Sequence, residues 1–251
     1  MRLALLSIPA VRSALSLELG REIEYHESLG STQERARALA SHGAPPSVVI
    51  ADEQTGGQGT KGRAWIAAKG TSLLASWLFR PAPAEPGLFV VLAGVAVARA
   101  LDGLGASGAL LKWPNDVELD RKKVAGTLAH ATTDGEGGSL VLGIGVNVHQ
   151  RSTDFPAELA PIATSVALAG HRIDRLSLLA RLTRELDRVA EPRERPAALA
   201  EWRARATLLG KPVEVTRDGA SRRGIARDIA DDGALIVDDE RVVAGEVRPL
   251  G

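Results

Sequence analysis

Apolar and polar positions near the start of the chain predict a helix followed by two strands. Ser31 can cap a helix whose pattern runs to Gly43, and Glu34 can complete a capping box with it. Residues 47–54 begin with a continuous apolar run, which predicts a buried strand. Residues 71–81 alternate as a second strand that a proline ends. The glycine-rich segment between these runs is therefore predicted to be a loop that joins two strands.

The middle of the chain predicts a buried helix and then neighbouring strands. Residues 86–105 are apolar on nearly every helical face and end in glycine, which is typical of a helix inside the core. Residues 109–120, 122–132 and 138–150 are three strand-like stretches separated by turn signals, as expected for adjacent antiparallel strands. These elements predict an α+β fold with a mixed or antiparallel central sheet and flanking helices.

The last part of the chain predicts two more helices and a small separate module. Residues 175–190 and 196–210 have helical patterns, and the second stops at Gly210. The remainder predicts four short strands joined by Asp-Gly-type turns, which suggests a small barrel. We therefore divide the chain into domains 1–209 and 210–251. We expect the second domain to pack on the first, because about 40 residues cannot hold a robust core alone.

The composition is that of an ordinary globular chain and excludes several kinds of chemistry. The 251 residues are 45% hydrophobic and 25% charged, and the formal net charge is zero. Proteins that bind nucleic acid usually carry a strong positive field, so we expect no DNA partner. The chain has no cysteine, which excludes disulfides, thiolate metal sites and a cysteine nucleophile.

The apolar start of the chain does not predict export. Pro9 interrupts the apolar stretch, Arg12 closes it, and no clear cleavage motif follows. No run approaches the ~20 apolar residues needed to span a bilayer. We expect a cytoplasmic protein with no membrane partner, in line with the absence of cysteine.

The segment from Gly56 to Trp65 has the composition of an anion-binding loop. Its glycines allow backbone amides to approach an anion closely, and Lys61 and Arg63 add charge that matches phosphate oxygens. A P-loop would continue after Gly62 with lysine and then serine or threonine, whereas arginine and alanine follow here. The alternative interpretation is a mobile hairpin whose charges face water.

Further candidate residues lie in the predicted strands that follow. Lys112 and Asp116 flank a rigid Trp-Pro-Asn turn, and Lys123 enters the next strand. Two lysines and an aspartate near one sheet edge can stabilise a polyphosphate and its magnesium, although a hairpin with solvated charges is the alternative. Gly143 and Gly145 place small residues inside a strand, where a ligand or another part of the chain approaches closely.

Trp65 has two possible roles, and the histidines have no evident one. Trp65 can stack on a base or fill a gap in the core. The five histidines show neither metal-binding spacing nor a catalytic triad, so we interpret them as incidental.

Taken in order, these motifs resemble those of a known family. The order is Ser-Thr at a helix start, a basic glycine loop, Lys-Trp-Pro-Asn-Asp, Lys-x-Ala-Gly and Gly-x-Gly-x-Asn. From about Ser28 to Asn147, this order resembles the biotin protein ligase family. Residues 211–251 are similar to the small SH3-like domain that ends many members.

The resemblance implies both a fold and an activity. The implied fold is the catalytic domain related to class II aminoacyl-tRNA synthetases, followed by an SH3-like β-barrel. The implied enzyme uses ATP and biotin as substrates and Mg²⁺ as cofactor, releases pyrophosphate and holds biotinyl-5′-AMP. It then passes the biotinyl group to a lysine of a biotin carboxyl carrier protein, from acetyl-CoA carboxylase or a related carboxylase. The sequence does not decide between a monomer and a homodimer.

Matched residue by residue, the resemblance also implies a site. Lys123 and Arg63 are expected to be catalytic, with Lys123 at the biotin carboxylate and the α-phosphate. Asp116 is the expected magnesium ligand. The expected biotin-binding residues are Ser31, Thr32, Gln54, Gly57, Gly126 and Leu128. The expected ATP- and adenylate-binding residues are Gly59, Thr60, Lys61, Gly62, Arg63, Trp65, Lys112, Asn115 and Asn147.

One departure from the family pattern affects the loop. The family loop usually reads Gly-Arg-Gly-Arg-x-Gly-Arg, and this chain has Gln58 and Thr60 where the first two arginines would be. We expect weaker loop closure, or recruitment of Lys61 in their place, and hypothesise that the adenylate escapes more readily than usual. The segment before Ser28 is too short for the winged helix of the members that act as repressors, so we expect no operator binding.

Three alternatives remain beside this interpretation. A lipoate protein ligase shares the general fold and chemistry, but the Lys-Trp-Pro-Asn-Asp motif favours biotin. A non-catalytic biotin- or nucleotide-sensing module is the second, and the presence of Arg63 and Lys123 argues against it. A nucleic-acid-binding protein is the third, weakened by the neutral charge. An octanoyl transferase of the same superfamily is excluded because it works through a cysteine thioester.

Overall fold

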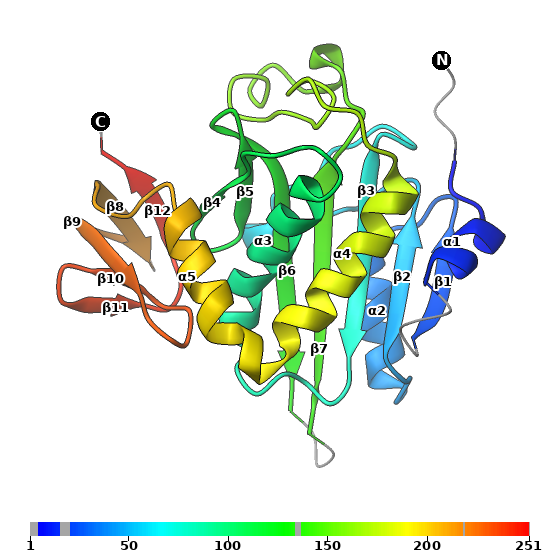
Figure 1. Ribbon diagram of the computed structural model, residues 1–251, viewed down its shortest axis with the longest axis horizontal. Coiled ribbons are helices and arrows are strands. Elements are labelled where there is room, and N and C mark those ends of the chain that lie inside the picture. Colours follow the sequence, from blue (N-terminus) through cyan, green and yellow to red (C-terminus); the bar gives the residue numbers. More distant parts are fainter. Residues whose placement is uncertain (1–4, 16–20, 134–136, 218, 251) are drawn as a thin grey trace.

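The computed structural model describes residues 5–15, 21–133, 137–217 and 219–250. At its centre is a seven-stranded sheet with the strand order β1-β2-β3-β7-β6-β5-β4 (Figure 1). β1 and β2 are parallel and the other neighbouring pairs are antiparallel, so the sheet is mixed, as predicted. The strands are β1 (Glu22–His26), β2 (Ser47–Ala51), β3 (Ser72–Phe79), β4 (Leu110–Lys112), β5 (Asp116–Leu119), β6 (Lys122–Thr132) and β7 (Ser139–Asn147).

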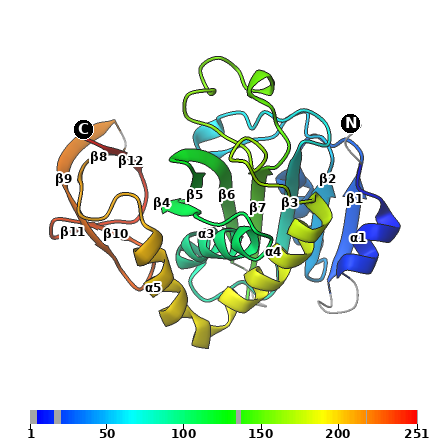
Figure 2. The same cartoon turned by 45° about the horizontal axis from the view of Figure 1, so that its top comes forward.

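Helices cover both faces of this sheet. On one face, Ala36 and Ala40 of α2 pack against residues of β2, β3 and β7. α3 and α4 lie on the opposite face, and α5 follows beside α3 (Figures 1 and 2). The helices are α1 (Ile8–Leu15), α2 (Thr32–Ser41), α3 (Pro86–Asp102), α4 (Arg175–Ala190) and α5 (Arg195–Arg205), with short 3₁₀ turns at Thr60–Gly62, Ser152–Asp154 and Pro192–Glu194.

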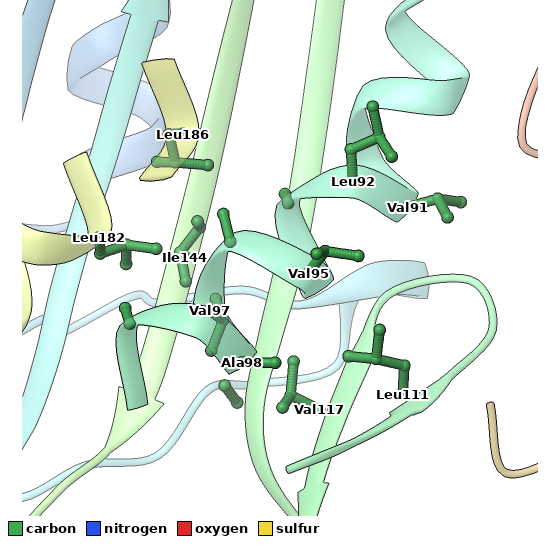
Figure 3. Close-up of a cluster of buried hydrophobic side chains, with 14 of the residues drawn as sticks. Val91, Leu92, Val95, Val97, Ala98, Leu111, Val117, Ile144, Leu182 and Leu186 are labelled. Atoms are coloured by element: carbon green, nitrogen blue, oxygen red, sulfur yellow. The ribbon is translucent and has the colours of Figure 1, made fainter. Parts of the chain in front are cut away.

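The core is built around α3. Figure 3 shows Val95 and Val97 of this helix among Leu182 and Leu186 of α4 and Ile144 of β7. A helix that is apolar on nearly every face can bury itself against a sheet and a second helix at once, which α3 does. The predicted buried helix is therefore confirmed. In the described part of the chain, none of the helices is both long enough and apolar enough to cross a bilayer.

The first predicted helix also begins and ends where the sequence indicates. Ser31 is the N-cap of α2, and its Oγ accepts a hydrogen bond of 3.3 Å from the backbone N–H of Glu34. Gly43, just after the helix, has a φ of 74°, the left-handed region that glycine adopts without strain. This cap fixes the position of Ser31 and Thr32 at the end of α2 that faces the glycine-rich loop.

The C-terminal strands form a second, antiparallel sheet of five strands, where the sequence predicted four. It packs on the rest of the molecule, as expected: the indole Nε1 of Trp113 donates to the carbonyl of Gly233 at 2.9 Å, and Val213 belongs to the main core. The predicted boundary between 209 and 210 falls in the segment between α5 and β8. The strands are β8 (Pro212–Arg217), β9 (Ala220–Ile229), β10 (Leu235–Val237), β11 (Glu240–Val242) and β12 (Glu246–Pro249), in the order β11-β10-β9-β8-β12.

Some elements differ from the prediction. The stretch 109–120 forms two paired strands, β4 and β5, because its Trp-Pro-Asn segment is the turn between them. β3 is buried along its whole length, because α2 covers one of its faces and α4 the other. The helix predicted over 196–210 ends at Arg205. Helix α1 and strand β1 were not predicted from the sequence; the first four residues of the apolar start lie outside the described residues.

Candidate active site

A hollow on the α2 face of the sheet is formed where three strands carry small residues. β3, β7 and β6 are neighbours, and their side chains alternate between the α2 face and the core that contains α3. At the centre of the hollow both β7 residues are glycine. Two rows of directly paired residues cross its floor: Leu74, Gly145 and Gly126 in the first row, and Ser76, Gly143 and Leu128 in the second.

Two side chains from other elements lie over these glycines. A Cβ added at Gly145 would lie 2.6 Å from Cε2 of the Trp65 ring, and one added at Gly126 would lie 3.2 Å from the same ring. A Cβ added at Gly143 would clash with the carboxamide oxygen of Gln33. The strand glycines are therefore required for close approach, as predicted, and the groups that approach are Trp65 in the first row and Gln33 in the second.

The second row ends in a cluster of uncharged polar groups. Gln54, after β2, accepts hydrogen bonds at its Oε1 from the backbone N–H and the hydroxyl of Thr32, at 2.7 and 2.9 Å. The hydroxyl of Ser76 donates to that of Thr32 at 2.9 Å. Thr32 and Ser76 are buried, so this network fixes the α2 end of the hollow with donors and acceptors and no net charge.

The first row ends beneath the ammonium group of Lys123. Glu118 of β5 is paired with Lys123 of β6 and Val117 with Ala125, so β6 has one extra residue, Val124, at this point. Such a bulge reverses the alternation of side chains, and it brings Lys123 to the same face as Gly126. The Nζ of Lys123 would lie 3.1 Å from a Cβ at Gly126, and it is 5.7 Å from the ring centroid of Trp65.

Lys123 is held both by its charge and by its backbone. Its Nζ lies 2.6 Å from a carboxylate oxygen of Asp116, and both side chains are partly exposed. Its backbone N–H donates to the carbonyl of Ile162 at 2.8 Å, and its carbonyl accepts from Thr164 at 2.9 Å. The segment 162–164 therefore fixes the main chain from which the ammonium extends.

The glycine-rich loop forms a small hairpin beside the first row. Gln58 is bridged to Ala64, and the backbone of Gly59 bonds the carbonyl of Arg63 at 2.7 Å. The tip turns through left-handed conformations at Lys61 and Gly62, with φ of 59° and 70°. Gln58, Gly59 and Thr60 of this hairpin line the hollow, and binding of an anion by the loop stays a prediction.

Neither of the two charged residues of the loop points into the hollow. The guanidinium of Arg63 is exposed and donates to the hydroxyl and carbonyl of Thr60, at 3.2 and 3.4 Å. The Nζ of Lys61 lies 3.1 Å from Oε2 of Glu246, in β12 of the C-terminal sheet. The sequence predicted either weaker loop closure or recruitment of Lys61 in place of the missing arginines, and the ammonium of Lys61 is directed to the C-terminal sheet.

A buried ion pair anchors the strand from which the loop leaves. The carboxylate of Asp52 is fully buried, and it pairs with Arg175, the first residue of α4, and accepts a 2.6 Å hydrogen bond from the Tyr25 hydroxyl. Burial, and then the bond to the Asp52 carboxylate, raises the pKa of Tyr25 above its usual range. Because Gln54 follows two residues later, this cluster holds the start of the loop in place.

Comparisons with known proteins decide the family. Residues 26–147 match the Biotin/lipoate A/B protein ligase family, and residues 208–247 match the Biotin protein ligase C terminal domain. A biotin–[acetyl-CoA-carboxylase] ligase of Mycobacterium tuberculosis is 36% identical over 233 residues, which cover 87% of this chain and 84% of that protein. The chain belongs to the biotin protein ligase family.

Other biotin protein ligases are similar over different lengths. The bifunctional ligase/repressor BirA of Bacillus subtilis is 38% identical over 181 residues, which cover 69% of this chain and 55% of that protein. The match thus spans about half the length of that relative. The structure of a biotin protein ligase from Aquifex aeolicus in complex with biotin and ATP has a TM-score of 0.75 and 26% identity, covering 91% of this chain and 99% of the other. The predicted fold class is confirmed.

Many of the residues expected from the biotin protein ligase pattern meet at one pocket. The pocket contains about 480 Å³ of empty space, part of it open to solvent. The expected residues that line it are Ser31, Thr32, Gln54, Gly59, Thr60, Trp65, Asn115, Lys123, Gly126 and Leu128. The expected residues that do not line it are Gly57, Lys61, Gly62, Arg63, Lys112, Asp116 and Asn147.

The expected residues outside the lining have identifiable positions. Asp116 contacts the pocket through its ion pair with Lys123, and Lys112 is paired with Asp116 on the neighbouring strand. Asn147 is buried at the end of β7, where its amide donates to the carbonyl of Thr164 at 3.0 Å and accepts from Gln150 at 2.8 Å. Asn147 therefore holds the segment 162–164, which hydrogen-bonds the backbone of Lys123.

Several residues that line the pocket were not assigned to the site from sequence. Ser76 is a hydroxyl inside an apolar strand, two positions from Leu74 on the same face, and this spacing was the available signal. Gln33 follows the Ser-Thr pair directly and could have been included with it. The lining residues not assigned beforehand are Gln33, Gln58, Leu74, Ala75, Ser76, Thr127 and Ile144. Gly143 and Gly145, which also line the pocket, were predicted as points of close approach without a role in binding.

Proposed function

We propose that this chain is an ATP-dependent ligase that activates biotin as biotinyl-5′-AMP, releases pyrophosphate and transfers the biotinyl group to a lysine of a carrier protein. The observation that carries this proposal is the polarity of the pocket. An uncharged hydrogen-bonding cluster closes one end, and Lys123 stands at the other. A ligand with a neutral ring and a carboxylate at the end of a short chain fits that distribution of charge.

The uncharged end suits the bicyclic head of biotin. A ureido group has both N–H donors and a carbonyl acceptor, and Ser31, Thr32 and Gln54 offer both kinds of partner. A ring that enters this end is enclosed between Leu128 and the Thr32–Ser76 pair. Since a buried polar group that loses its partner is costly, this end discriminates against acids that lack matching hydrogen-bonding groups.

The cationic end suits the first chemical step. A carboxylate oxygen of biotin attacks the α-phosphorus of ATP, the bond from that phosphorus to the bridging β-phosphate oxygen breaks, and pyrophosphate leaves. The ammonium of Lys123 can neutralise the two anions that must approach each other. The indole Nε1 of Trp65 is buried without an acceptor among the described residues, so a bound nucleotide can provide one. No protein nucleophile is needed.

The second step transfers the acyl group. The neutral amine of a carrier lysine attacks the acyl carbon of the mixed anhydride, AMP leaves with the former carboxylate oxygen, and an amide forms with loss of the amine proton. The partner we propose is a biotin carboxyl carrier protein of acetyl-CoA carboxylase or a related carboxylase. The relative of M. tuberculosis that bears this activity in its name supports that choice.

Magnesium fits this pocket as an ion that arrives with ATP. Among the described residues, no three His, Cys, Asp or Glu side chains gather as a metal site. Mg²⁺ commonly binds one carboxylate together with substrate phosphates and keeps several waters. Asp116 is the carboxylate that would contribute, and its pairing with Lys123 places it at the cationic end. When bound, the ion would neutralise charge on the departing pyrophosphate.

Exchange of labelled pyrophosphate into ATP tests the proposal without a carrier. The protein is supplied with magnesium and, in turn, with biotin, lipoate and octanoate. We expect exchange with biotin alone. Lys123→Ala is expected to lower the rate by about 10²–10³-fold, the usual effect of removing one group that stabilises developing charge.

Lys122→Ala is the matched control, because Lys122 is the preceding residue on β6 and its side chain is exposed. It should exchange like the unmodified protein. Exchange driven by lipoate instead of biotin would replace the proposal with lipoate ligation. Binding of biotin and ATP without exchange would identify a sensor module that lacks the chemistry.

A further inference from the structure

A cluster of buried polar side chains lies where β7 ends, beside the segment that holds the backbone of Lys123. Its members come from the start of β3, from the end of β7 and the residues after it, and from the segment 164–165. A buried polar group is costly unless it is hydrogen-bonded, so the members of such a cluster hold one another in fixed positions. The residues are Ser72, Asn147, Gln150, Thr164 and Ser165.

Gln150 makes hydrogen bonds to three other members of this cluster. Its side-chain Nε2 donates to the hydroxyl of Ser72 and, at 2.8 Å, to Oδ1 of Asn147. Its backbone carbonyl accepts a hydrogen bond from the hydroxyl of Ser165 at 2.7 Å. Gln150 is only 1% exposed and lies behind the residues that line the pocket, so it can affect the reaction only through its neighbours.

One series of hydrogen bonds leads from Gln150 to Lys123. The Nδ2 of Asn147 donates to the carbonyl of Thr164, and the backbone N–H of Thr164 donates to the carbonyl of Lys123. Gln150 fixes the direction in which the Asn147 carboxamide faces, because a flipped carboxamide would turn its Nδ2 toward the Nε2 donor. The side chain of Gln150 therefore helps to hold the main chain from which the Lys123 ammonium extends.

A second series of contacts leads from Gln150 to the glycine-rich loop. Ser72 is the first residue of β3, the strand that follows the loop. Its carbonyl accepts a hydrogen bond from Arg175 at 3.3 Å, and Arg175 pairs with the buried carboxylate of Asp52, at the start of the loop. Gln150 thus connects the base of the loop to the segment that holds Lys123.

We propose that Gln150 is a positioning residue for adenylation, an inference that rests on the proposed function. It acts through Lys123, because it fixes the place of the ammonium relative to the glycine-rich loop. A carboxylate attacks a phosphate only when both are aligned, and a misplacement of about 1 Å can lower the rate by about 10²-fold. Loss of Gln150 should therefore lower kcat, while the uncharged end of the pocket keeps its affinity for the ring.

Pyrophosphate exchange by Gln150→Met tests this inference, because methionine fills a similar volume and donates no hydrogen bond. We expect kcat with biotin to fall by about tenfold or more, and the KM for biotin to stay within about twofold of that of the unmodified protein. In the Lys123→Ala background, the same substitution should lower the rate no further. An independent structural defect would lower it by the same factor in both backgrounds.

Two further variants complete the design. Ser165→Ala removes the hydrogen bond to the Gln150 carbonyl and should lower kcat in the same direction, so it serves if Gln150→Met does not fold. Thr183→Val is the matched control, because its buried hydroxyl on α4 accepts a hydrogen bond from the Trp77 indole at 3.1 Å, within the apolar core. It should lower the stability to urea and leave kcat unchanged.

The outcomes separate the inference from the proposed function. If the unmodified protein exchanges with biotin and both Gln150→Met and Ser165→Ala keep its kcat, Gln150 does not position Lys123 and the proposed function stands. If Gln150→Met lowers the rate by the same factor with and without Lys123, its role is structural and the inference is overturned. If the unmodified protein shows no exchange with biotin, the proposed function fails and the inference fails with it.

Discussion

The ammonium of Lys61 lies 3.1 Å from Oε2 of Glu246, so the tip of the glycine-rich loop is tied to the last strand of the C-terminal sheet. The other carboxylate oxygen of Glu246 accepts two hydrogen bonds from Arg248, at 2.7 and 2.9 Å. These bonds, first that of Arg248 and then that of Lys61, lower the pKa of Glu246 below its usual range. The C-terminal sheet thus contacts the loop that borders the pocket.

Glu246→Gln should loosen the loop without unfolding the protein. A partly exposed ion pair of this kind contributes on the order of 0.2–1 kcal/mol, which is small beside the stability of a domain. Lys61 and Arg63 are trypsin sites at the tip, so cleavage there should become faster in the variant. Raising the salt concentration should accelerate cleavage in the unmodified protein, because salt screens the pair, and have less effect in the variant.

The control for this experiment is Glu214→Gln. Glu214 pairs with Arg223 within the C-terminal sheet. Equal cleavage rates at the loop in the Glu246 variant and the unmodified protein would show that the ion pair does not anchor the tip.

Gly145→Ala should displace Trp65 from the pocket. The added Cβ would lie 2.6 Å from the indole, and overpacking of this degree forces the ring to move. We expect a red shift of tryptophan emission and a biotin affinity lower by about tenfold or more. Gly87→Ala is the control, because its nearest neighbour would be 3.8 Å away. Unchanged emission and affinity in Gly145→Ala would contradict the packing of Trp65 over β7.

Glu118→Gln should stabilise the protein at neutral pH more than at acid pH. Burial raises the pKa of Glu118 above its ordinary 4.5, with Lys112 opposing and Asp116 adding to the shift. A carboxyl with a raised folded-state pKa contributes stability below pH 4.5 that is lost as the pH rises through the folded value. Glutamine has no charged form, so the variant does not lose this stability as the pH rises.

Urea unfolding of both proteins between pH 4 and pH 8 measures this difference. The gain in unfolding free energy from Glu118→Gln should grow as the pH rises from about 4 to 7. Glu158→Gln, at an exposed position, should show no such growth. If the gain in unfolding free energy from Glu118→Gln shrinks as the pH rises, the pKa of Glu118 is lowered in the folded state, and the predicted effect of burial is wrong.

Biotinyl-5′-AMP should escape from this protein more readily than from relatives with an arginine-rich loop. Gln58 and Thr60 line the pocket without charge, and Arg63 is turned to Thr60. With biotin and ATP present, mass spectrometry should find biotin on lysines of an added bystander protein. The combined change Gln58→Arg and Thr60→Arg should reduce this labelling, and Thr55→Arg, at an exposed position, should not. A bystander without biotin would end the hypothesis.

Much of the frame of the site could be predicted because it depends on local rules. The cap of α2 follows from Ser31 and Glu34 a short distance apart, and the loop between β2 and β3 follows from two apolar runs with glycines between them. Gly143 and Gly145 marked the point of close approach. The edge strand β1 was missed because its charged residues alternate with apolar ones in a run of only five.

The parts that were not predicted depend on contacts between distant segments. Nothing around Lys61 indicates that its partner is Glu246, 185 residues away. Gln33 belongs to a surface-like polar helix start, and only the pairing of β6 with β7 places two carbonyls within its reach. Local patterns therefore identify which segments meet, and the register of the sheet decides which side chains touch.

The bulge at Val124 decides on which face of the sheet the ammonium of Lys123 lies. In an unbroken β6, Lys123 would share a face with Ala125 and Thr127 and point into the apolar interior. One additional residue in β6 turns it outward while Gly126 and Leu128 keep their places. Lys123 and Gly126 are three residues apart, so they share a face only because β6 is bulged between them. The same residues in the same order along an unbroken strand would put the lysine on the opposite side of the sheet from Gly126.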